Sequence, residues 1–367
     1  MTERSYHLRM GYPLYKNAGH LLESAGSLRE GLENSALYMR VRLACLVISL
    51  VLAGCGGGSI GAGANAMPTP SSPVILTSRQ FALPSTLSGP TGLTIGPNGA
   101  MWFTAFDASA IGRITPEGSV SAFPLPTSED EPSSIVKGPD GALWFTEYSG
   151  NRIGRITTSG AITEYPLPRP SSEPEALVSA SDGALWFTEQ TAQAIGRITT
   201  AGAVTDYPLP AESNPGPMTL GSDGTPWFAE VGANKIAHIS LLGVVTSYTI
   251  PVAKSGPYGI TTGSDGAIWF TQYDAAKIGR VTTSGTFTEY ALPVGVSFPN
   301  QIGTGPDGAL WFLAQGYIGR ITTGGTITVY ANGNIDTGSL NAITAGPDGN
   351  VWYTRRLGPT INWVTPP

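Results

Sequence analysis

Residues 138–168 read GPDGALWFTEYSGNRIGRITTSGAITEYPLP, and close variants of this stretch recur along the chain. Its tryptophan, Trp144, has counterparts at a regular spacing of 41 or 42 residues: Trp102, Trp186, Trp227, Trp269, Trp311 and Trp352. A period of this length is typical of arrays of small structural units. The seven copies therefore predict one closed body, although 367 residues would by length alone suggest two or three domains.

One repeat divides into four short segments with β-strand character. These segments are 134–136, 142–146, 153–157 and 162–167. Asp140-Gly141 and Ser159-Gly160 are turn sequences of the kind that joins antiparallel strands. Four strands in about 42 residues is the size of a propeller blade. Neighbouring blades would cover both faces of each sheet, so the consecutive Leu-Trp-Phe run can be buried.

The two ends of the chain predict how the ring closes. The seventh repeat stops at Pro367 without a fourth strand, whereas Gln80–Pro84 matches the fourth-strand sequence Glu164–Pro168. Pairing the first strand with the last repeat would remove an exposed sheet edge. The prediction is an all-β, seven-bladed β-propeller of four-stranded antiparallel blades over residues 75–367, with its last blade closed by the N-terminal strand at 75–84.

The residues before the propeller have the pattern of an export signal. Met39–Arg42 is basic, Leu43–Leu52 is apolar, and Leu52-Ala53-Gly54-Cys55 follows. This order is typical of a signal peptide, with translation expected to start at Met39. The last four residues resemble the lipobox of bacterial lipoproteins, which implies cleavage before Cys55 and lipidation of its sulfur. We expect a leader at 1–54 and a flexible tether at 55–74.

Composition excludes several classes of protein. The formal net charge is −6, only 13% of residues are charged and no basic run occurs, so a nucleic-acid partner is not expected. Cys45 lies in the leader and Cys55 is the first residue of the tether, which leaves the propeller without a cysteine and excludes disulfides there. The only histidine after the leader is His238, and no Ser-His-Asp triad is expected.

The combination of DGALWFTE at 140–147, NRIGRIT at 151–157 and ITEYPLP at 162–168 resembles the virginiamycin B lyase (streptogramin lyase) family. The resemblance covers residues 75–367 and implies a seven-bladed propeller. It also implies a Mg²⁺-dependent C–O lyase reaction that opens a cyclic peptide lactone. In that reaction one histidine acts as the base, two glutamates hold the metal and a second histidine contacts the substrate.

The family's functional positions are occupied by other residues here. They fall on Asn300 in blade six and on Ser339, Asn341 and Arg355 in blade seven. An asparagine cannot accept a proton at neutral pH, and an arginine would repel Mg²⁺. The resemblance therefore implies the fold more firmly than the reaction, and whether the chain is an enzyme stays open. No catalytic residue is assigned; Asn300 and Asn341 are candidate substrate-binding residues.

A relocated acidic site is an alternative. The strand order would bring inter-blade loops and the ends of second strands to one rim, and five glutamates fall there over three adjacent blades: Glu131, Glu147, Glu173, Glu189 and Glu230. Carboxylate oxygens suit Mg²⁺ or Ca²⁺. A solvated rim explains the same residues, because Trp-Phe-Thr-Glu is simply the consensus of the repeat.

Two further residues are candidates for function. Tyr258 opens blade five, where it could stack on a ligand ring or fill the central channel. His238 stands where other blades place an arginine of the third strand, and a structural role is expected for it.

Three functions remain. We expect a monomeric ligand- or partner-binding propeller, anchored through lipid on Cys55 in the cell envelope on the periplasmic or extracellular face. Its rim would engage a small molecule, a glycan or an envelope protein. The alternatives are a virginiamycin B lyase-type enzyme and an envelope assembly protein without a ligand pocket.

Overall fold

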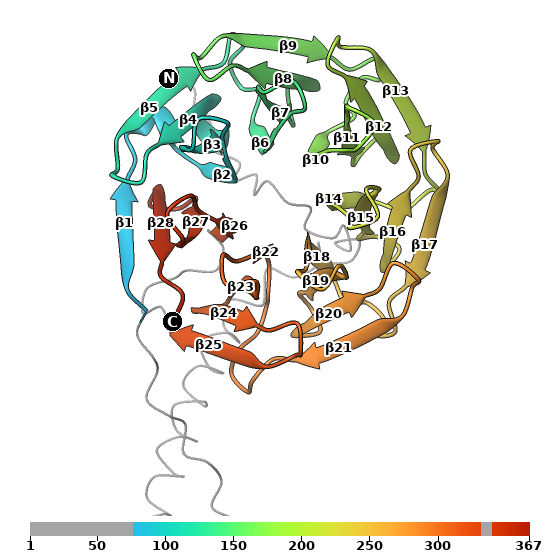
Figure 1. Ribbon diagram of the computed structural model, residues 1–367. Coiled ribbons are helices and arrows are strands. Elements are labelled where there is room, and N and C mark those ends of the chain that lie inside the picture. Colours follow the sequence, from blue (N-terminus) through green and yellow to red (C-terminus); the bar gives the residue numbers. More distant parts are fainter. Residues whose placement is uncertain (1–75, 332–339) are drawn as a thin grey trace, which may run out of the picture. The chain divides into compact units, whose positions relative to one another are not determined.

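Seven four-stranded antiparallel sheets follow one another around a ring in the computed structural model, which describes residues 76–331 and 340–367 (Figure 1). The predicted seven-bladed propeller is confirmed. The expected leader, the lipidation site Cys55 and the tether lie outside the described residues, as does Ser339. No helix in the described ranges is long and apolar enough to cross a membrane.

In each blade the first strand lies nearest the centre of the ring and the fourth strand lies at the outside (Figure 1). Blades one to three comprise β2 (Pro90–Ile95), β3 (Met101–Ala105), β4 (Ala110–Ile114) and β5 (Val120–Pro124); β6 (Pro132–Lys137), β7 (Leu143–Glu147), β8 (Arg152–Ile156) and β9 (Ile162–Pro166); and β10 (Pro174–Ser179), β11 (Ala184–Glu189), β12 (Ala194–Thr199) and β13 (Val204–Pro208). Short 3₁₀ turns occupy Ser85–Leu87 and Phe106–Ala108.

The remaining blades repeat this plan. They comprise β14 (Pro215–Leu220), β15 (Pro226–Glu230), β16 (Lys235–Ile239) and β17 (Val245–Thr249); β18 (Pro257–Thr262), β19 (Ile268–Gln272), β20 (Lys277–Val281) and β21 (Phe287–Ala291); β22 (Ile302–Thr304), β23 (Leu310–Ala314), β24 (Tyr317–Ile321) and β25 (Ile327–Ala331); and β26 (Leu340–Ala345), β27 (Val351–Arg355) and β28 (Thr360–Val364). The observed strand ends of blade two differ from the predicted ones by at most two residues, whereas the closing strand predicted at 75–84 is shorter, Ser78–Ala82.

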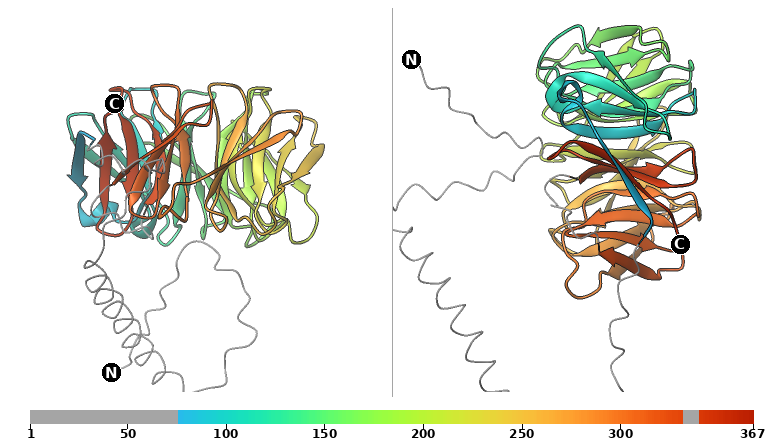
Figure 2. Two further views of the ribbon diagram at one scale, coloured as in Figure 1. Left: turned by 90° about the horizontal axis from the view of Figure 1, so that it is seen from below. Right: turned by 90° about the vertical axis from the view of Figure 1, so that its left-hand side faces the viewer.

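The first strand closes the ring, as predicted. β1 (Ser78–Ala82) pairs antiparallel with β28, with Phe81 opposite Ile361, and supplies the missing fourth strand of blade seven (Figures 1 and 2). Phe81 stacks on Trp352 with 5.7 Å between ring centroids, as Tyr165 stacks on Trp144 at 5.4 Å. The joined ends therefore reproduce the packing of an ordinary blade.

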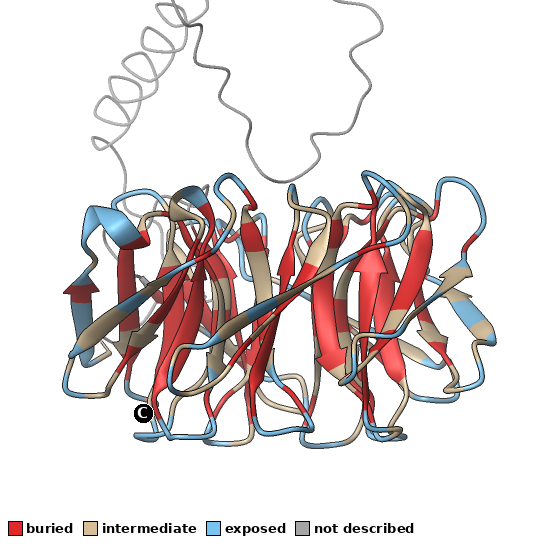
Figure 3. Ribbon diagram, turned by 90° about the horizontal axis from the view of Figure 1, so that it is seen from above, coloured by how far each residue is buried: buried red, intermediate tan, exposed pale blue. Residues whose placement is uncertain are grey.

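The core consists of hydrophobic clusters between neighbouring blades, and the buried residues concentrate in the second and third strands of each blade (Figure 3). Trp144 packs with Phe187 of the next blade, and Phe145 packs with Trp102 of the preceding blade. Gly154 faces the Phe145 ring, where even one added carbon atom would collide with the ring. Both faces of each sheet are thus buried, which explains the unbroken apolar run in the second strand.

An aspartate in the first turn of the repeat contacts two side chains that recur in most blades, the tryptophan of the second strand and the arginine of the third strand. Asp140 accepts a hydrogen bond from the Trp144 indole at 3.0 Å and pairs with Arg155 Nε at 2.6 Å. Blades three, five and six repeat the ion pair as Arg197–Asp182, Arg280–Asp265 and Arg320–Asp307. In blade one Asn98 accepts a hydrogen bond from the Trp102 indole, also at 3.0 Å. Arg113 there donates a hydrogen bond to Ser121 and has no aspartate in the turn to pair with.

We expect Asp140→Ala to lower the free energy of unfolding by about 1–3 kcal/mol, because it leaves the buried Trp144 indole N–H without an acceptor. Asp140→Asn should cost less, since Asn98 shows that an amide oxygen serves the indole equally well. Urea unfolding of both variants measures the difference. Equal losses would contradict a role for the indole hydrogen bond.

Candidate functional site

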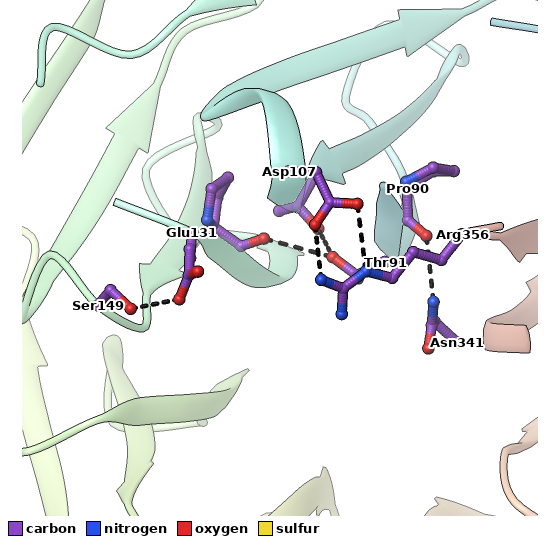
Figure 4. Close-up of polar contacts among 9 residues, drawn as sticks. Pro90, Thr91, Asp107, Glu131, Ser149, Asn341 and Arg356 are labelled. Carbon is purple, nitrogen blue, oxygen red and sulfur yellow. Dashed lines mark hydrogen bonds and ion pairs between the residues drawn. The ribbon is translucent and has the colours of Figure 1, made fainter. Parts of the chain in front are cut away.

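One rim of the ring carries both the links between blades and the loops that follow the second strands, because successive strands run antiparallel. Figure 4 shows part of this rim at the junction of blades seven, one and two. Arg356 of blade seven pairs with Asp107 of blade one at 2.6 Å, and Ser149 donates to Glu131. The predicted site residues are distributed between this rim and the interior of the blades.

Blade two holds a buried acidic corner of three side chains. Asp130 comes from the link before β6, Glu147 ends β7 and Glu164 lies in β9; one carboxylate oxygen of each lies within 4.8 Å of the others. Glu147 is 0% exposed and neither of its oxygens has a hydrogen-bond partner. Arg152 Nη1 pairs with Asp130 Oδ1 at 2.9 Å and is the cation of the corner.

Burial and mutual repulsion make this corner electrostatically unfavourable. Burial first, and then the charges of Glu164 and Asp130, raise the pKa of Glu147 to about 8. Burial also raises the pKa of Asp130, against the opposing effect of Arg152. Asp130 Oδ2 and Glu164 Oε1 are, like both oxygens of Glu147, buried without a partner. Buried carboxylates of this kind are costly unless something neutralises them.

The same corner is less acidic in the other blades. In blade three Glu189 is fully buried and faces Asp206, whose other partner is Arg169 at 3.3 Å, and Ser172 takes the place of Asp130. Burial and then the charge of Asp206 raise the pKa of Glu189 to about 7. In blade four Glu230 is 2% exposed and pairs in register with Lys235.

Blade five shows a neutral version of the corner. Gln272 replaces the glutamate and its Nε2 donates to Glu289 Oε1 at 3.0 Å, while Lys277 Nζ pairs with Glu289 Oε2 at 3.1 Å. One carboxylate and one ammonium group balance each other there. The propeller therefore forms this corner without any excess of negative charge, and the acidity of blade two is not a requirement of the fold.

The other two predicted metal ligands occupy a different position. Glu131 and Glu173 lie in the links between blades, where each accepts from a loop hydroxyl, Ser149 and Thr191 respectively. Tyr148 also donates to Glu173, at 3.0 Å. The five glutamates thus divide into two rim residues and three, namely Glu147, Glu189 and Glu230, that are buried inside their blades rather than solvated.

The two candidate asparagines bridge neighbouring blades. Asn300 is 7% exposed, and its amide donates to the carbonyl of Leu340 in blade seven at 3.0 Å. Asn341 donates in the same way to Pro90 of blade one at 3.4 Å (Figure 4). Arg355 ends β27 and pairs in register with Leu340. Both amides therefore contribute to blade-to-blade contacts.

Tyr258 belongs to an aromatic strip on the same rim. Its ring lies 5.8 Å from that of Tyr273, which lies 5.1 Å from that of Phe298. Tyr273 and Phe298 are 37% and 41% exposed, so they present ring surface to solvent. His238, by contrast, stacks on Trp227 at 4.6 Å inside blade four, which agrees with the structural role expected for it.

A closed ring of seven four-stranded blades, with variable side chains gathered on one rim, defines the chain as a seven-bladed β-propeller. The family model for virginiamycin B lyases matches residues 75–252 and 211–366. The chain belongs to this family. Comparison with curated proteins gives no match.

Solved structures support the assignment. Selenomethionine-substituted virginiamycin B lyase from Staphylococcus aureus is 36% identical with a TM-score of 0.75, over 80% of this chain and all of that one. A catalytically inactive histidine-to-alanine variant of the same enzyme, solved with quinupristin, gives the same values. Hydrazine synthase from Kuenenia stuttgartiensis, at 14% identity and a TM-score of 0.63 over 77% of this chain and 97% of that one, shares the fold alone.

Asp130 and Glu164 were not predicted as site residues. Asp130 precedes the predicted Glu131, and Glu164 lies within the ITEYPLP motif, opposite Gly154 in the sheet. At that position the other complete blades carry Ala122, Asp206, Ser247, Glu289 and Val329. A comparison of blades along the fourth strand would have shown acidic residues opposite the buried glutamates of blades two and three.

Glu189 predicts a pH dependence of stability. Its pKa is about 7 in the folded protein against 4.5 for an unperturbed glutamate, so the folded state binds the proton more tightly. The resulting stabilisation is complete below about pH 4.5 and is lost as the pH rises towards 7. Glu189→Gln should therefore lose less unfolding free energy than the wild type between about pH 4.5 and about pH 7.5, as measured by urea denaturation.

The control is Glu212→Gln, which makes the same exchange of carboxyl for amide at an exposed position in the link before blade four. A Glu189→Gln profile that runs parallel to that of the wild type would show that this carboxyl is ionised in the folded protein throughout the range.

Proposed function

We propose that this chain is a membrane-anchored, streptogramin-lyase-like propeller that binds a ring-bearing small molecule at its rim and does not cleave it. The family and the fold support a ligand of the streptogramin type. The aromatic strip of Tyr258, Tyr273 and Phe298 supplies the binding surface. Two arguments carry the proposal: the chemistry of the residues at the family's functional positions, and the backbone conformation of Phe298.

The residues at the family's functional positions do not fit an elimination reaction. Asn300 and Asn341 carry amides that cannot take up a proton from a substrate, and each amide donates to a neighbouring blade. The guanidinium of Arg355 at a position assigned to a Mg²⁺ ligand repels a cation. These residues therefore do not fit Mg²⁺, and we derive no lyase step through it.

Phe298 is the single observation that favours ligand binding most strongly. It adopts a left-handed conformation with φ of 53°. At the same link position blades one to five have Gly89, Glu131, Glu173, Asn214 and Gly256, all with positive φ and none of them aromatic. A bulky residue in this conformation costs about 1–3 kcal/mol. The strained conformation of Phe298 holds its exposed ring against the ring of Tyr273. The fold itself does not need this contact. Aromatic surface placed in this way suits stacking on a ligand ring.

The proposed anchor is the lipid on Cys55, which would place the propeller on the periplasmic or extracellular face of a membrane. The signal-peptide pattern before Cys55 supports it. We expect Cys55→Ala to move the protein from the membrane fraction to the soluble fraction of expressing cells. Equal membrane association of the variant and the wild type would contradict lipid anchoring.

Quinupristin is the probe for the binding site. We expect calorimetry to detect binding to the full-length protein, and Phe298→Asn to weaken it by roughly tenfold, since a lost aromatic contact costs about 0.5–1.5 kcal/mol beyond buried area. The melting temperature of this variant should stay equal or rise, because asparagine tolerates the left-handed conformation. Loss of stability together with binding would mean that Phe298 serves the fold.

The control is Leu242→Ala, which removes an exposed side chain from the turn between β16 and β17 on the opposite rim and should leave binding unchanged. Mass spectrometry after incubation of quinupristin with protein and Mg²⁺ separates binding from cleavage. An intact macrocycle is expected, and ring-opened product would establish the lyase alternative. No binding and no product would overturn the proposal.

A further inference from the structure

We propose that the acidic corner of blade two, formed by Asp130, Glu147 and Glu164, is a Ca²⁺ site that fastens the link between blades one and two to the sheet of blade two. This site is separate from the aromatic strip and does not depend on the proposed function.

Four carboxylate oxygens meet in the corner without a hydrogen-bond partner: Asp130 Oδ2, both oxygens of Glu147 and Glu164 Oε1. Each of them is buried, and Glu147 as a whole residue is 0% exposed. Buried polar atoms in folded proteins normally have a partner. The remaining oxygens of the corner are already used, since Asp130 Oδ1 pairs with Arg152 and Glu164 Oε2 accepts from Thr127 at 3.3 Å. Each of the three carboxylates therefore keeps at least one buried oxygen that is not used by a neighbour.

The charge of the corner matches a divalent cation. Three carboxylates and the guanidinium of Arg152 leave two negative charges when all groups are ionised. A bound Ca²⁺ ion balances these two charges. Blade five reaches neutrality differently: Gln272 and Ser255 stand where blade two has Glu147 and Asp130, and Lys277 takes the place of Arg152. Neutrality at this corner is thus achieved by residues in one blade and requires a ligand in the other.

The geometry suits calcium better than magnesium. Ca²⁺ binds oxygens at about 2.3–2.6 Å, so two of its ligands can lie up to about 5 Å apart, whereas the limit for Mg²⁺ at about 2.0–2.1 Å is about 4 Å. One oxygen from each of the three carboxylates lies within 4.8 Å of the others. Ca²⁺ also accepts irregular sets of carboxylates, whereas Mg²⁺ retains several waters, for which this buried corner offers little room.

The position explains what such an ion would do. Phe145, Glu147 and Gly154 share the face of blade two that packs against blade one. Asp130 comes from the link between those two blades, and so does Thr127. Gly154 leaves space beside Glu147, where an added carbon atom would approach its Oε1 to 2.7 Å. An ion held by Asp130, Glu147 and Glu164 would therefore join the link to two strands of the blade.

The test is a Ca²⁺ titration of the full-length protein after treatment with a chelator. We expect one bound ion per chain by equilibrium dialysis, and a rise in melting temperature on the order of 5 °C at a hundredfold excess over the dissociation constant. Glu147→Gln and Asp130→Ser should both abolish binding and the rise. Without Ca²⁺, Glu147→Gln should melt above the wild type, because a glutamine there can donate to Glu164 as Gln272 donates to Glu289.

Glu189→Gln is the matched control. Glu189 is equally buried at the same position of blade three, but Ser172 replaces the third carboxylate there, so this variant should keep wild-type Ca²⁺ binding. No bound ion at millimolar Ca²⁺, or binding that survives Glu147→Gln, would overturn the proposal. Binding of Mg²⁺ in preference to Ca²⁺ with the same pattern of variants would overturn the assignment to calcium.

Discussion

The buried indole N–H of the repeated tryptophan is the constraint on which each blade depends. Trp144 is completely buried, so its N–H needs an acceptor inside the protein, and Asp140 provides one from the preceding turn. The same carboxylate holds Arg155, whose guanidinium lies over the indole ring. Turn, second strand and third strand are thereby fixed relative to one another. Where the arginine is absent, in blade four, His238 stacks directly on Trp227 and covers the same face.

Because the constraint is local and repeats every 41 or 42 residues, the fold could be predicted from the sequence. The turn aspartate, the Trp-Phe run and the glycine opposite the phenylalanine recur together in four of the seven blades, so a strand assignment that is ambiguous in one blade can be taken from the others. The closing strand could also be predicted from the sequence, because Phe81 occupies the position in its segment that Tyr165 occupies in blade two. Both rings stack on a tryptophan in the structure. Strand ends were less certain because the bulge after Pro132 shifts the register of the first two strands.

The candidate sites could be predicted only in part, because they depend on contacts that the repeat does not encode. Sequence spacing placed Glu131 and Glu147 at one end of blade two, but Glu147 is buried and faces Asp130 and Glu164. The side-chain direction at the end of a strand depends on pairing register, which a single sequence leaves undetermined. Likewise Asn300 and Asn341 were expected to face a ligand, whereas their amides bond the next blade, a contact made only after the ring has closed.

A propeller offers an internal standard for function, since each blade shows what the fold requires at a given position. At the link position with positive φ, blades one to five have glycine, asparagine or glutamate and no aromatic residue, so the bulky side chain of Phe298 adds strain that the fold could have avoided. The corner at the end of the second strand is neutral in blade five, so the three carboxylates of blade two add repulsion that was equally avoidable. Both features reduce stability in the free protein. A ligand that stacks on the first, or a cation that neutralises the second, recovers that free energy only on binding, which is how selection can retain an unfavourable residue.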